Sequence, residues 1–412
     1  MSIIVQKYGG TSVAGAERIQ AVADRVVAAR EAGHDVVVVV SAMGDTTDEL
    51  AQLAHRITPI PEPRELDMLL TAGERIAMAL LAIAVCARGC RAASYTGSQA
   101  GIITDTHHGK ARIVDIRPKR IIESLQAGNV VILAGFQGLS TAYDITTLGR
   151  GGSDTTAVAM AAALGAEACE IYTDVPGVFT ADPRIVPGAR KVGKITYEAM
   201  LELAASGAKV LQLRSVEYAR RNDVRLHVRS SFSDGAGTWV VGEDEIGMEQ
   251  ALISGVALDD GEAKITLEDV PDRPGVAASI FKAVAAEGVN VDMIVQNVSH
   301  AGTTDLSFTV PRDDLPRLEA TVQRMIGQVG AARFSADDQI AKVSLVGAGM
   351  RSDPGVAADM FDALAAEGIN IEMISTSSIR VSCVIRAVDA ERAVRTLHMR
   401  FGLDEETSSA PT

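Results

Sequence analysis

The sequence predicts an α/β protein in which a three-layer αβα sandwich is followed by two copies of a smaller α/β unit. Three observations carry this prediction. Strand-like and helix-like runs alternate along the first part of the chain. Val36–Val40 is a continuous apolar run, typical of a strand that a parallel sheet buries on both faces. The last two-fifths of the chain contain an internal repeat at a constant offset of 80 residues.

The first part is expected to alternate in order along the chain. The first strand precedes a Gly-Gly turn, the first helix ends before a glycine, and each later strand precedes a helix or a turn. Ligands of such sheets bind at the carboxyl ends of the strands, where both glycine clusters of this part fall. The expected strands are Ile3–Val5, Val36–Val40, Ala92–Tyr95, Val130–Ala134 and Glu170–Thr173, and the expected helices are Ala16–Glu31, Glu65–Ala87, Pro118–Ala127 and Ala157–Leu164.

Composition limits the possible partners and compartments. The net charge of −14 over 412 residues opposes general affinity for nucleic acid or anionic membranes. The longest aliphatic run is far too short to span a bilayer, and the N-terminus has no charged leader, so we expect a cytoplasmic protein. Buried, reduced thiols and no metal site are expected of the four cysteines, which are Cys86, Cys90, Cys169 and Cys383.

The repeat defines the domain organisation. Pro274–Ala278 recurs as Pro354–Ala358, and Ala285–Asn290 recurs as Ala365–Asn370. Each copy is typical of a strand, an amphipathic helix and a second strand, which suits a small-ligand sensor or a purely structural duplicate. A polar turn region near 233–250 precedes the repeat. We therefore predict domains at 1–247, 248–335 and 336–404, with a disordered polar tail at 405–412.

The glycine-rich segment Thr147–Thr156 is the main candidate site. It combines Arg150, Asp154, four hydroxyls and three glycines, between a predicted strand and a predicted helix. Glycines let the backbone approach a ligand closely, and a helix N-terminus attracts anions. The segment is therefore suited to binding a small anionic molecule, although a solvated surface turn is the alternative.

Three further clusters lie after strands or at a helix start. Lys7–Ser12 follows the first strand, Ser41–Gly44 follows the second, and Glu74 lies at Thr71–Arg75. Neither a P-loop nor a dinucleotide motif is present among them. Thr173–Arg184 is a stiff Pro- and Gly-containing loop that frames a nucleotide or serves only as a turn.

Together these clusters predict a site for two anions, a phosphate chain and a small zwitterion. Arg150 suits a carboxylate, because its guanidinium binds bidentately. Asp154 and Glu74 suit an ammonium group, and Lys7 suits a phosphoryl group during transfer. A carboxylate acceptor is already ionised and needs no general base. We accordingly expect no catalytic histidine, with His107 and His108 exposed to solvent.

These motifs resemble the aspartate kinase family over residues 2–402. The matching segments are Lys7–Ser12, Val40–Met43, Thr71–Glu74, Thr146–Thr156 and Tyr172–Asp174, and the repeats resemble paired ACT domains that bind effector amino acids. The resemblance implies an amino acid kinase fold followed by two ferredoxin-like βαββαβ ACT units. It also implies ATP-dependent phosphorylation of the L-aspartate side-chain carboxylate to 4-phospho-L-aspartate. That reaction leads toward lysine, diaminopimelate, threonine and methionine.

By the same resemblance, residues take four roles. Lys7 and Asp154 would be catalytic. Aspartate would be bound by Ser41, Thr47, Glu74, Arg150, Gly151, Gly152, Ser153 and Asp154. ATP, with Mg²⁺ bridging its phosphates, would contact Lys7, Tyr8, Gly9, Gly10, Ser41, Thr173, Asp174, Phe179, Asp182, Arg184 and Lys209. An effector, lysine or threonine or both, would contact Asp272, Gly275, Ala277, Asn290, Gln296, Asn297, Asn370 and Ile371.

Two features qualify the resemblance. Ser378 stands where family members often have glutamate, which puts the usual feedback by lysine in doubt. Met248 stands where some relatives begin a shorter subunit, so a homodimer or an α₂β₂ assembly is expected. Two other functions stay open on sequence alone, another amino-acid kinase of the same fold and a non-catalytic amino-acid sensor.

Overall fold

The computed structural model describes residues 2–246 except 209, and 253–297, 302–347, 350, 353 and 355–404. Met248, Lys209 and the tail 405–412, which the sequence analysis singled out, lie outside the described residues. The chain forms two compact units. The first contains 1–178, 191–204 and 209–249, and the second contains 179–190, 205–208 and 250–412.

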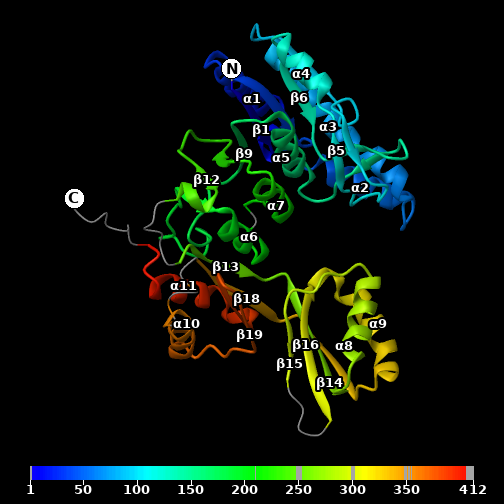
Figure 1. Ribbon diagram of the computed structural model, residues 1–412, viewed down its shortest axis with the longest axis vertical. Helices are drawn as coiled ribbons and strands as arrows, with labels where there is room; N and C mark the ends of the chain where they lie inside the picture. The colour runs from blue at the N-terminus through cyan, green and yellow to red at the C-terminus, as the bar shows by residue number, and fades with distance from the viewer. Residues whose placement is uncertain are drawn as a thin grey trace, which may run out of the picture. The chain divides into compact units, whose positions relative to one another are not determined.

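An eight-stranded sheet is the centre of the first unit (Figure 1). Its strands pair in parallel except for β11 with β12, and the central strands are buried along nearly their whole length. Buried aliphatic runs form such strands because β-branched side chains pack well on a pleated surface covered on both faces. In spatial order the strands are β10 (Lys194–Thr196), β12 (Thr238–Val241), β11 (Leu226–Ser230), β9 (Ala168–Thr173), β1 (Ile3–Tyr8), β2 (Asp35–Val40), β6 (Val130–Ala134) and β3 (Ala92–Tyr95).

Helices cover both faces of this sheet. On one face, α1 (Ala16–Glu31) and α3 (Pro63–Cys86) form one hydrophobic core with alternate residues of β1, β2 and β6. On the other, α5 (Gly152–Leu164) packs on β1, β2 and β9 and is itself contacted by α7 (Leu213–Arg221). The predicted three-layer αβα sandwich is therefore confirmed. The remaining helices are α2 (Thr46–Ile57), α4 (Lys119–Gln126) and α6 (Tyr197–Ala205).

Helix α3 is, among the described residues, the one helix long and apolar enough by length and composition to cross a membrane. One face of it is buried against α1, β3, β6 and β8. That packing accounts for its apolar composition as a core helix. The expectation of buried thiols holds for Cys169 and Cys383, and Cys90 is partly buried. It is wrong for Cys86, which lies exposed at the end of α3. All four are free.

A second, small sheet of the first unit was not predicted. It has the order β5 (Ile113–Ile116), β4 (Ile102–Thr104), β7 (Gln137–Ser140), β8 (Ile145–Thr147), and β8 packs on α3. Strands of three or four residues carry little periodicity, which accounts for the failure to predict these four. The sheet matters because β8 leads directly into the glycine segment.

The second unit holds the two repeats, each with a four-stranded antiparallel sheet. In the first repeat the order is β15 (Ile294–Gln296), β16 (Thr303–Pro311), β14 (Glu262–Pro271), β17 (Arg333–Asp337). Figure 1 shows α8 (Val276–Ala286) and α9 (Leu315–Val329) on one face of that sheet, where they enclose a core. This is the expected βαββαβ order.

The second sheet has the order β13 (Gly255–Asp259), β18 (Ile340–Val346), β20 (Arg380–Arg386), β19 (Met373–Thr376). It is covered by α10 (Gly355–Ala366) and α11 (Ala390–Arg400). Strand β13 precedes the whole first repeat in sequence yet pairs with β18. The second repeat is thus completed by a strand from upstream. The boundaries proposed at 248 and 336 stay a prediction.

Ionic groups join the two repeats. Lys342 on β18 is fully buried, and its Nζ lies 2.5 Å from Asp292, 3.2 Å from Glu262 and 3.6 Å from Asp259. Burial lowers the pKa of Lys342, but the carboxylates of Glu262 and Asp292 outweigh it and raise that pKa. A buried ammonium is tolerated because several carboxylates surround it. Met293, Ile340, Met373 and Val384 form a small shared core beside these charges.

Candidate active site

A cavity of about 950 Å³ opens in the first unit at the carboxyl ends of β1, β2 and β6. This is where parallel sheets ordinarily bind ligands. The structure brings together all the residues predicted to bind aspartate and part of the predicted ATP set. The predicted residues that line the cavity are Lys7, Gly9, Gly10, Ser41, Thr47, Glu74, Arg150, Gly151, Gly152, Ser153 and Asp154.

The glycine segment turns sharply into α5, which begins at Gly152. Gly151 is in the left-handed region with φ of 69°, and a Cβ there would lie 2.1 Å from the Gln212 side chain. A Cβ on Gly152 would lie 2.8 Å from the Phe136 ring. These positions require glycine because other residues would clash or be strained. The turn brings the N-terminus of α5, the positive end of the helix dipole, to the cavity.

Lys7 and Asp154 form an ion pair at the base of the cavity. Lys7 lies on β1 and Asp154 in the first turn of α5, and the Nζ–Oδ1 distance is 2.6 Å. Both side chains are largely buried, with 12% and 9% of their surface exposed. The pair holds the ammonium group of Lys7 at the cavity wall, where its remaining N–H groups stay available to a ligand.

Glu74 is a buried acid on α3 whose side chain lines the same cavity. The residue is 2% exposed, and its Oε2 has no hydrogen-bond partner among the described residues. Burial raises the pKa of Glu74 to about 7, although hydrogen bonds from the backbone at Glu74 and Ala42 partly oppose the rise. A buried carboxylate without a partner is costly in a structural role, so it marks a position where a cationic ligand group is expected. Arg150, by contrast, is exposed at the cavity rim.

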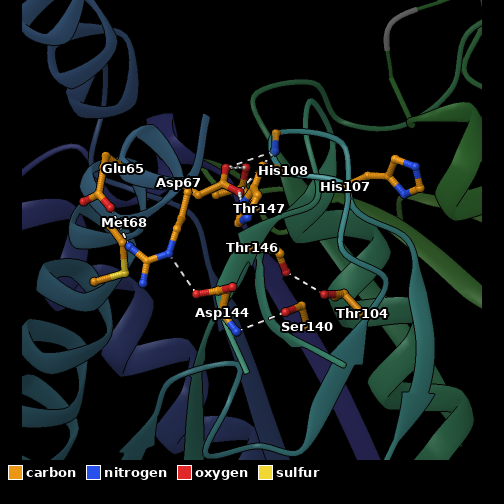
Figure 2. Close-up of polar contacts among 12 residues, drawn as sticks. Glu65, Asp67, Met68, Thr104, His107, His108, Ser140, Asp144, Thr146 and Thr147 are labelled. Atoms are coloured by element: carbon orange, nitrogen blue, oxygen red, sulfur yellow. Dashed lines mark hydrogen bonds and ion pairs between the residues drawn. The ribbon is translucent and has the colours of Figure 1, made fainter. Parts of the chain in front are cut away.

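A second buried acid, Asp67, was missed by the sequence analysis. It lies on α3 at 1% exposure and accepts hydrogen bonds from Thr147, from His108 and from the Gly109 backbone (Figure 2). Asp67 precedes Glu74 by seven residues, two helical turns, so the spacing places both acids on one helix face. That spacing was the signal available in the sequence.

The expectation that both histidines are exposed is wrong for His108. The His107 side chain is 80% exposed, whereas that of His108 is 19% exposed because its Nδ1 contacts Asp67 at 2.7 Å. The contact partner lies 41 residues away, on a helix that sequence proximity does not connect with this loop.

Several predicted ATP residues lie outside this cavity. Tyr8 is fully buried, with its ring stacked on Tyr172, which leaves its backbone for any ligand contact. Thr173 ends β9, the neighbour of β1, and Asp174 follows it. Phe179 and the ion-paired Asp182 and Arg184 belong to the second compact unit, and Lys209 lies outside the described residues. The roles of these residues stay predictions.

The described residues contain no group of three or more His, Cys, Asp and Glu that could hold a metal. Mg²⁺ in kinases ordinarily takes one or two carboxylates together with the phosphates of the nucleotide. Asp154, beside Lys7 in the cavity, could supply one such carboxylate ligand. The residues therefore fit a Mg²⁺ ion that arrives with the nucleotide.

A separate cavity of about 310 Å³ lies in the first repeat, where β14 ends and α8 begins. Four of the predicted effector residues line it, namely Asp272, Gly275, Ala277 and Gln296. Asn290, Asn297, Asn370 and Ile371 do not line it, although the Asn297 carbonyl accepts a hydrogen bond from the lining residue Thr304. Gly275 has φ of 96°, a conformation that suits the tight turn before α8.

Comparison with known proteins assigns the chain to a family. Residues 2–230 match the amino acid kinase family, and residues 265–327 and 343–401 each match an ACT domain. The aspartokinase of Mycobacterium tuberculosis (strain H37Rv) is 57% identical over 414 residues, covering 99% of this chain and 98% of the relative. The chain belongs to the aspartokinase family.

Other aspartokinases agree with this assignment. That of Corynebacterium glutamicum is 55% identical and covers 98% of this chain and 97% of its own. Escherichia coli aspartokinase III, solved with aspartate and ADP, superimposes with a TM-score of 0.82 at 27% identity, covering 97% of this chain and 99% of that one. The resemblance, the fold class and the kinase activity predicted from the sequence are confirmed, and this aspartokinase is an enzyme with two ACT domains.

Proposed function

We propose that the 950 Å³ cavity is where this aspartokinase transfers a phosphoryl group from ATP to the side-chain carboxylate of L-aspartate, giving 4-phospho-L-aspartate. The observation that carries the proposal is the meeting of Lys7, Glu74, Arg150 and Asp154 in one cavity at the strand ends. These residues supply charges of both signs, as a zwitterionic acceptor beside a phosphate chain requires.

The roles of the residues follow from their charges and positions. The Arg150 guanidinium at the rim suits bidentate binding of the α-carboxylate, and the buried Glu74 carboxylate suits the α-ammonium. The β-carboxylate of aspartate is then directed toward Lys7 and the glycines that follow β1. No general base is required, because this carboxylate is ionised near neutral pH.

Lys7 acts on the charge that develops on the phosphoryl group. Its ammonium is held by Asp154 at 2.6 Å, so it is positioned before the nucleotide arrives. Mg²⁺ would neutralise phosphate charge when bound, with Asp154 as its candidate protein ligand. On the nucleotide side we propose Tyr8 by its backbone, Gly9, Gly10, Ser41, Thr173 and Asp174, together with Phe179, Asp182, Arg184 and Lys209.

We further propose that an amino acid binds the 310 Å³ cavity as an effector, with Asp272 facing its ammonium group. Escherichia coli aspartokinase III has been solved with lysine and aspartate, and lysine or threonine is the candidate here. Ser378 in place of the frequent glutamate disfavours strong feedback by lysine alone. A homodimer or an α₂β₂ assembly with a subunit starting at Met248 belongs to the same proposal. The free thiols support a cytoplasmic location.

The test is a set of assays on the purified full chain. Incubation with ATP, Mg²⁺ and aspartate, with hydroxylamine to trap the acyl phosphate, is expected to give the aspartyl hydroxamate. Product with glutamate or its N-acetyl derivative, and none with aspartate, would reject the proposal. Titration with lysine and threonine, singly and together, then identifies the effector, and size-exclusion chromatography with intact mass measurement identifies the assembly.

A further inference from the structure

Asp67 joins three parts of the first unit that are distant in sequence. Its Oδ1 accepts a hydrogen bond from Thr147 Oγ1 at 2.5 Å, and its Oδ2 contacts His108 Nδ1 at 2.7 Å. The Gly109 backbone N–H lies 3.1 Å from both oxygens. Figure 2 shows the Asp67 carboxylate between Thr147 and His108. The donors come from β8 and from the loop between β4 and β5.

Both connected segments form walls of the cavity. Thr147 ends β8 and begins the glycine segment, with Arg150 three residues later. The β4–β5 loop, residues 105–112, carries Gly109 and Lys110, which line the cavity together with Asp67 and Thr147. Asp67 therefore fixes the segment that carries Arg150 to the loop that carries Lys110.

Further contacts hold the two segments side by side. The Ala111 N–H donates to the Thr147 carbonyl at 2.9 Å. Arg214 bridges them, donating to the carbonyls of Leu148 at 2.8 Å and Ala111 at 2.7 Å. Asp67 is the member of this set that anchors both segments to helix α3, a long and packed element.

The burial of Asp67 calls for a reason beyond stability. A carboxylate at 1% exposure costs free energy to desolvate, and its hydrogen bonds offset rather than exceed that cost. Burying a hydrophobic residue at this helix position would cost less free energy of desolvation. The carboxylate does what an apolar side chain cannot, because it accepts hydrogen bonds from three donors on two segments that are distant in sequence.

We propose that Asp67 and His108 are positioning residues that hold the 105–112 loop against the glycine segment and thereby fix the amino-acid end of the cavity. This inference rests on the proposed function of the cavity. Lys110 and Arg150, carried by the two tethered segments, both line this end of the cavity, where their positive charges suit an anionic amino acid. Neither Asp67 nor His108 touches the reacting atoms.

Breaking the tether is expected to change the KM of aspartate but not that of ATP. Loosening the tether displaces the groups that bind the amino acid, but leaves Gly9 and Gly10 after β1 unaffected. For His108→Ala we expect the aspartate KM to rise about tenfold, the scale of one hydrogen bond to a charged group, with the ATP KM within twofold of wild type. His108→Asn places an amide donor near the position of Nδ1 and is expected to restore the wild-type aspartate KM.

The matched control is Arg64→Ala. Arg64 is half-exposed on the same helix and pairs with Asp144 at 2.8 Å, so it ties α3 to the β7–β8 hairpin outside the cavity. Its removal is expected to leave both KM values unchanged. Because Asp67→Asn replaces a fully buried charge and risks misfolding, the test uses His108→Ala and, as a second break of the tether, Thr147→Val.

A second measurement makes the inference independent of the reaction. Hydrogen–deuterium exchange of peptides covering 105–112 and 147–152 is expected to quicken at least threefold in His108→Ala, and to stay at the wild-type rate in His108→Asn and Arg64→Ala. If the wild-type chain does not phosphorylate aspartate, the proposed function fails while exchange still tests the tether. If the wild type is active and His108→Ala changes neither the aspartate KM nor exchange, or raises both KM values equally, the inference is overturned.

Discussion

Replacing Glu74 by glutamine removes a buried charge from the cavity while keeping the shape of the side chain. The pKa of Glu74 is raised from 4.5 to about 7, chiefly by desolvation. A rise of this size corresponds to about 3 kcal/mol, at about 1.4 kcal/mol for each tenfold change in the ionisation constant. This is the free energy by which ionisation of Glu74 destabilises the ligand-free fold.

The sign of the pH dependence follows from the direction of the shift. Because the folded pKa exceeds the unfolded one, the folded state keeps a proton that the unfolded state releases between about pH 4.5 and pH 7. Wild-type stability therefore falls across this window and levels off above it. Glu74→Gln cannot ionise, so it should match wild type near pH 4.5 and exceed it by about 3 kcal/mol at pH 8, roughly 6–12 °C in Tm.

Although Glu74→Gln should raise stability, it should weaken the binding of aspartate. The Glu74 carboxylate is expected to accept a charge-assisted hydrogen bond from the substrate ammonium, and the loss of such a bond corresponds to an aspartate KM about 10–100-fold higher. In wild type, the aspartate KM is expected to rise as pH falls through about 7, because the carboxyl group becomes protonated. The variant should lack that dependence.

Thermal unfolding and the hydroxamate assay, both run from pH 5 to pH 8.5, test these expectations together. Glu65→Gln is the matched control, because Glu65 lies on the same helix with its side chain 66% exposed. The Glu65→Gln substitution should change neither the stability nor the aspartate KM. A Glu74→Gln protein less stable than wild type at pH 8, or one whose aspartate KM keeps the wild-type pH dependence, would refute the reasoning.

Three further predictions follow from the charges. Lys7→Met should abolish turnover and destabilise the fold by about 3–5 kcal/mol, since Asp154 is left buried without its partner. Adding Asp154→Asn should recover stability but not turnover, as unfolding and activity assays would show. Arg150→Lys should raise the aspartate KM several-fold at constant Tm, because lysine lacks the bidentate fork. Lys342→Met, which leaves three carboxylates without their buried cation, should destabilise the ACT unit by about 3–5 kcal/mol in thermal unfolding, with catalysis retained below the transition.

The sequence was sufficient for the features that depend on local pattern. The buried run at Val36–Val40 predicts a central parallel strand, and the structure places it between β1 and β6. The carboxyl ends of parallel strands meet at one edge, so motifs after β1 and β2 and at the start of α5 had to converge. The constant offset of the repeat likewise predicted two similar units.

What the sequence did not predict depends on pairing between distant segments. Strand β13 resembles an extra strand of the first repeat by its position, yet it pairs with β18, about 85 residues later in the chain. The partner of a β-strand is decided by which edge is open and which face is apolar, and neither property is local. The short strands β4, β5, β7 and β8 were missed for a second reason, because three or four residues carry too little periodicity.

Helix α3 joins the predicted and the unpredicted parts of the site. Glu74 and Asp67 lie on one face of this helix, two turns apart, and both are buried at the cavity. Glu74 has an unpartnered oxygen, whereas Asp67 accepts hydrogen bonds from two surrounding segments. This difference in hydrogen bonding indicates different roles. A buried acid with an unpaired oxygen is expected to bind a ligand group, whereas one with all its hydrogen bonds made is expected to hold parts of the protein in place. Helix α3 thereby carries both the acid that we propose to bind the ammonium group and the acid that we propose to hold the surrounding loops, so in this proposal α3 sets the width of the amino-acid end of the cavity.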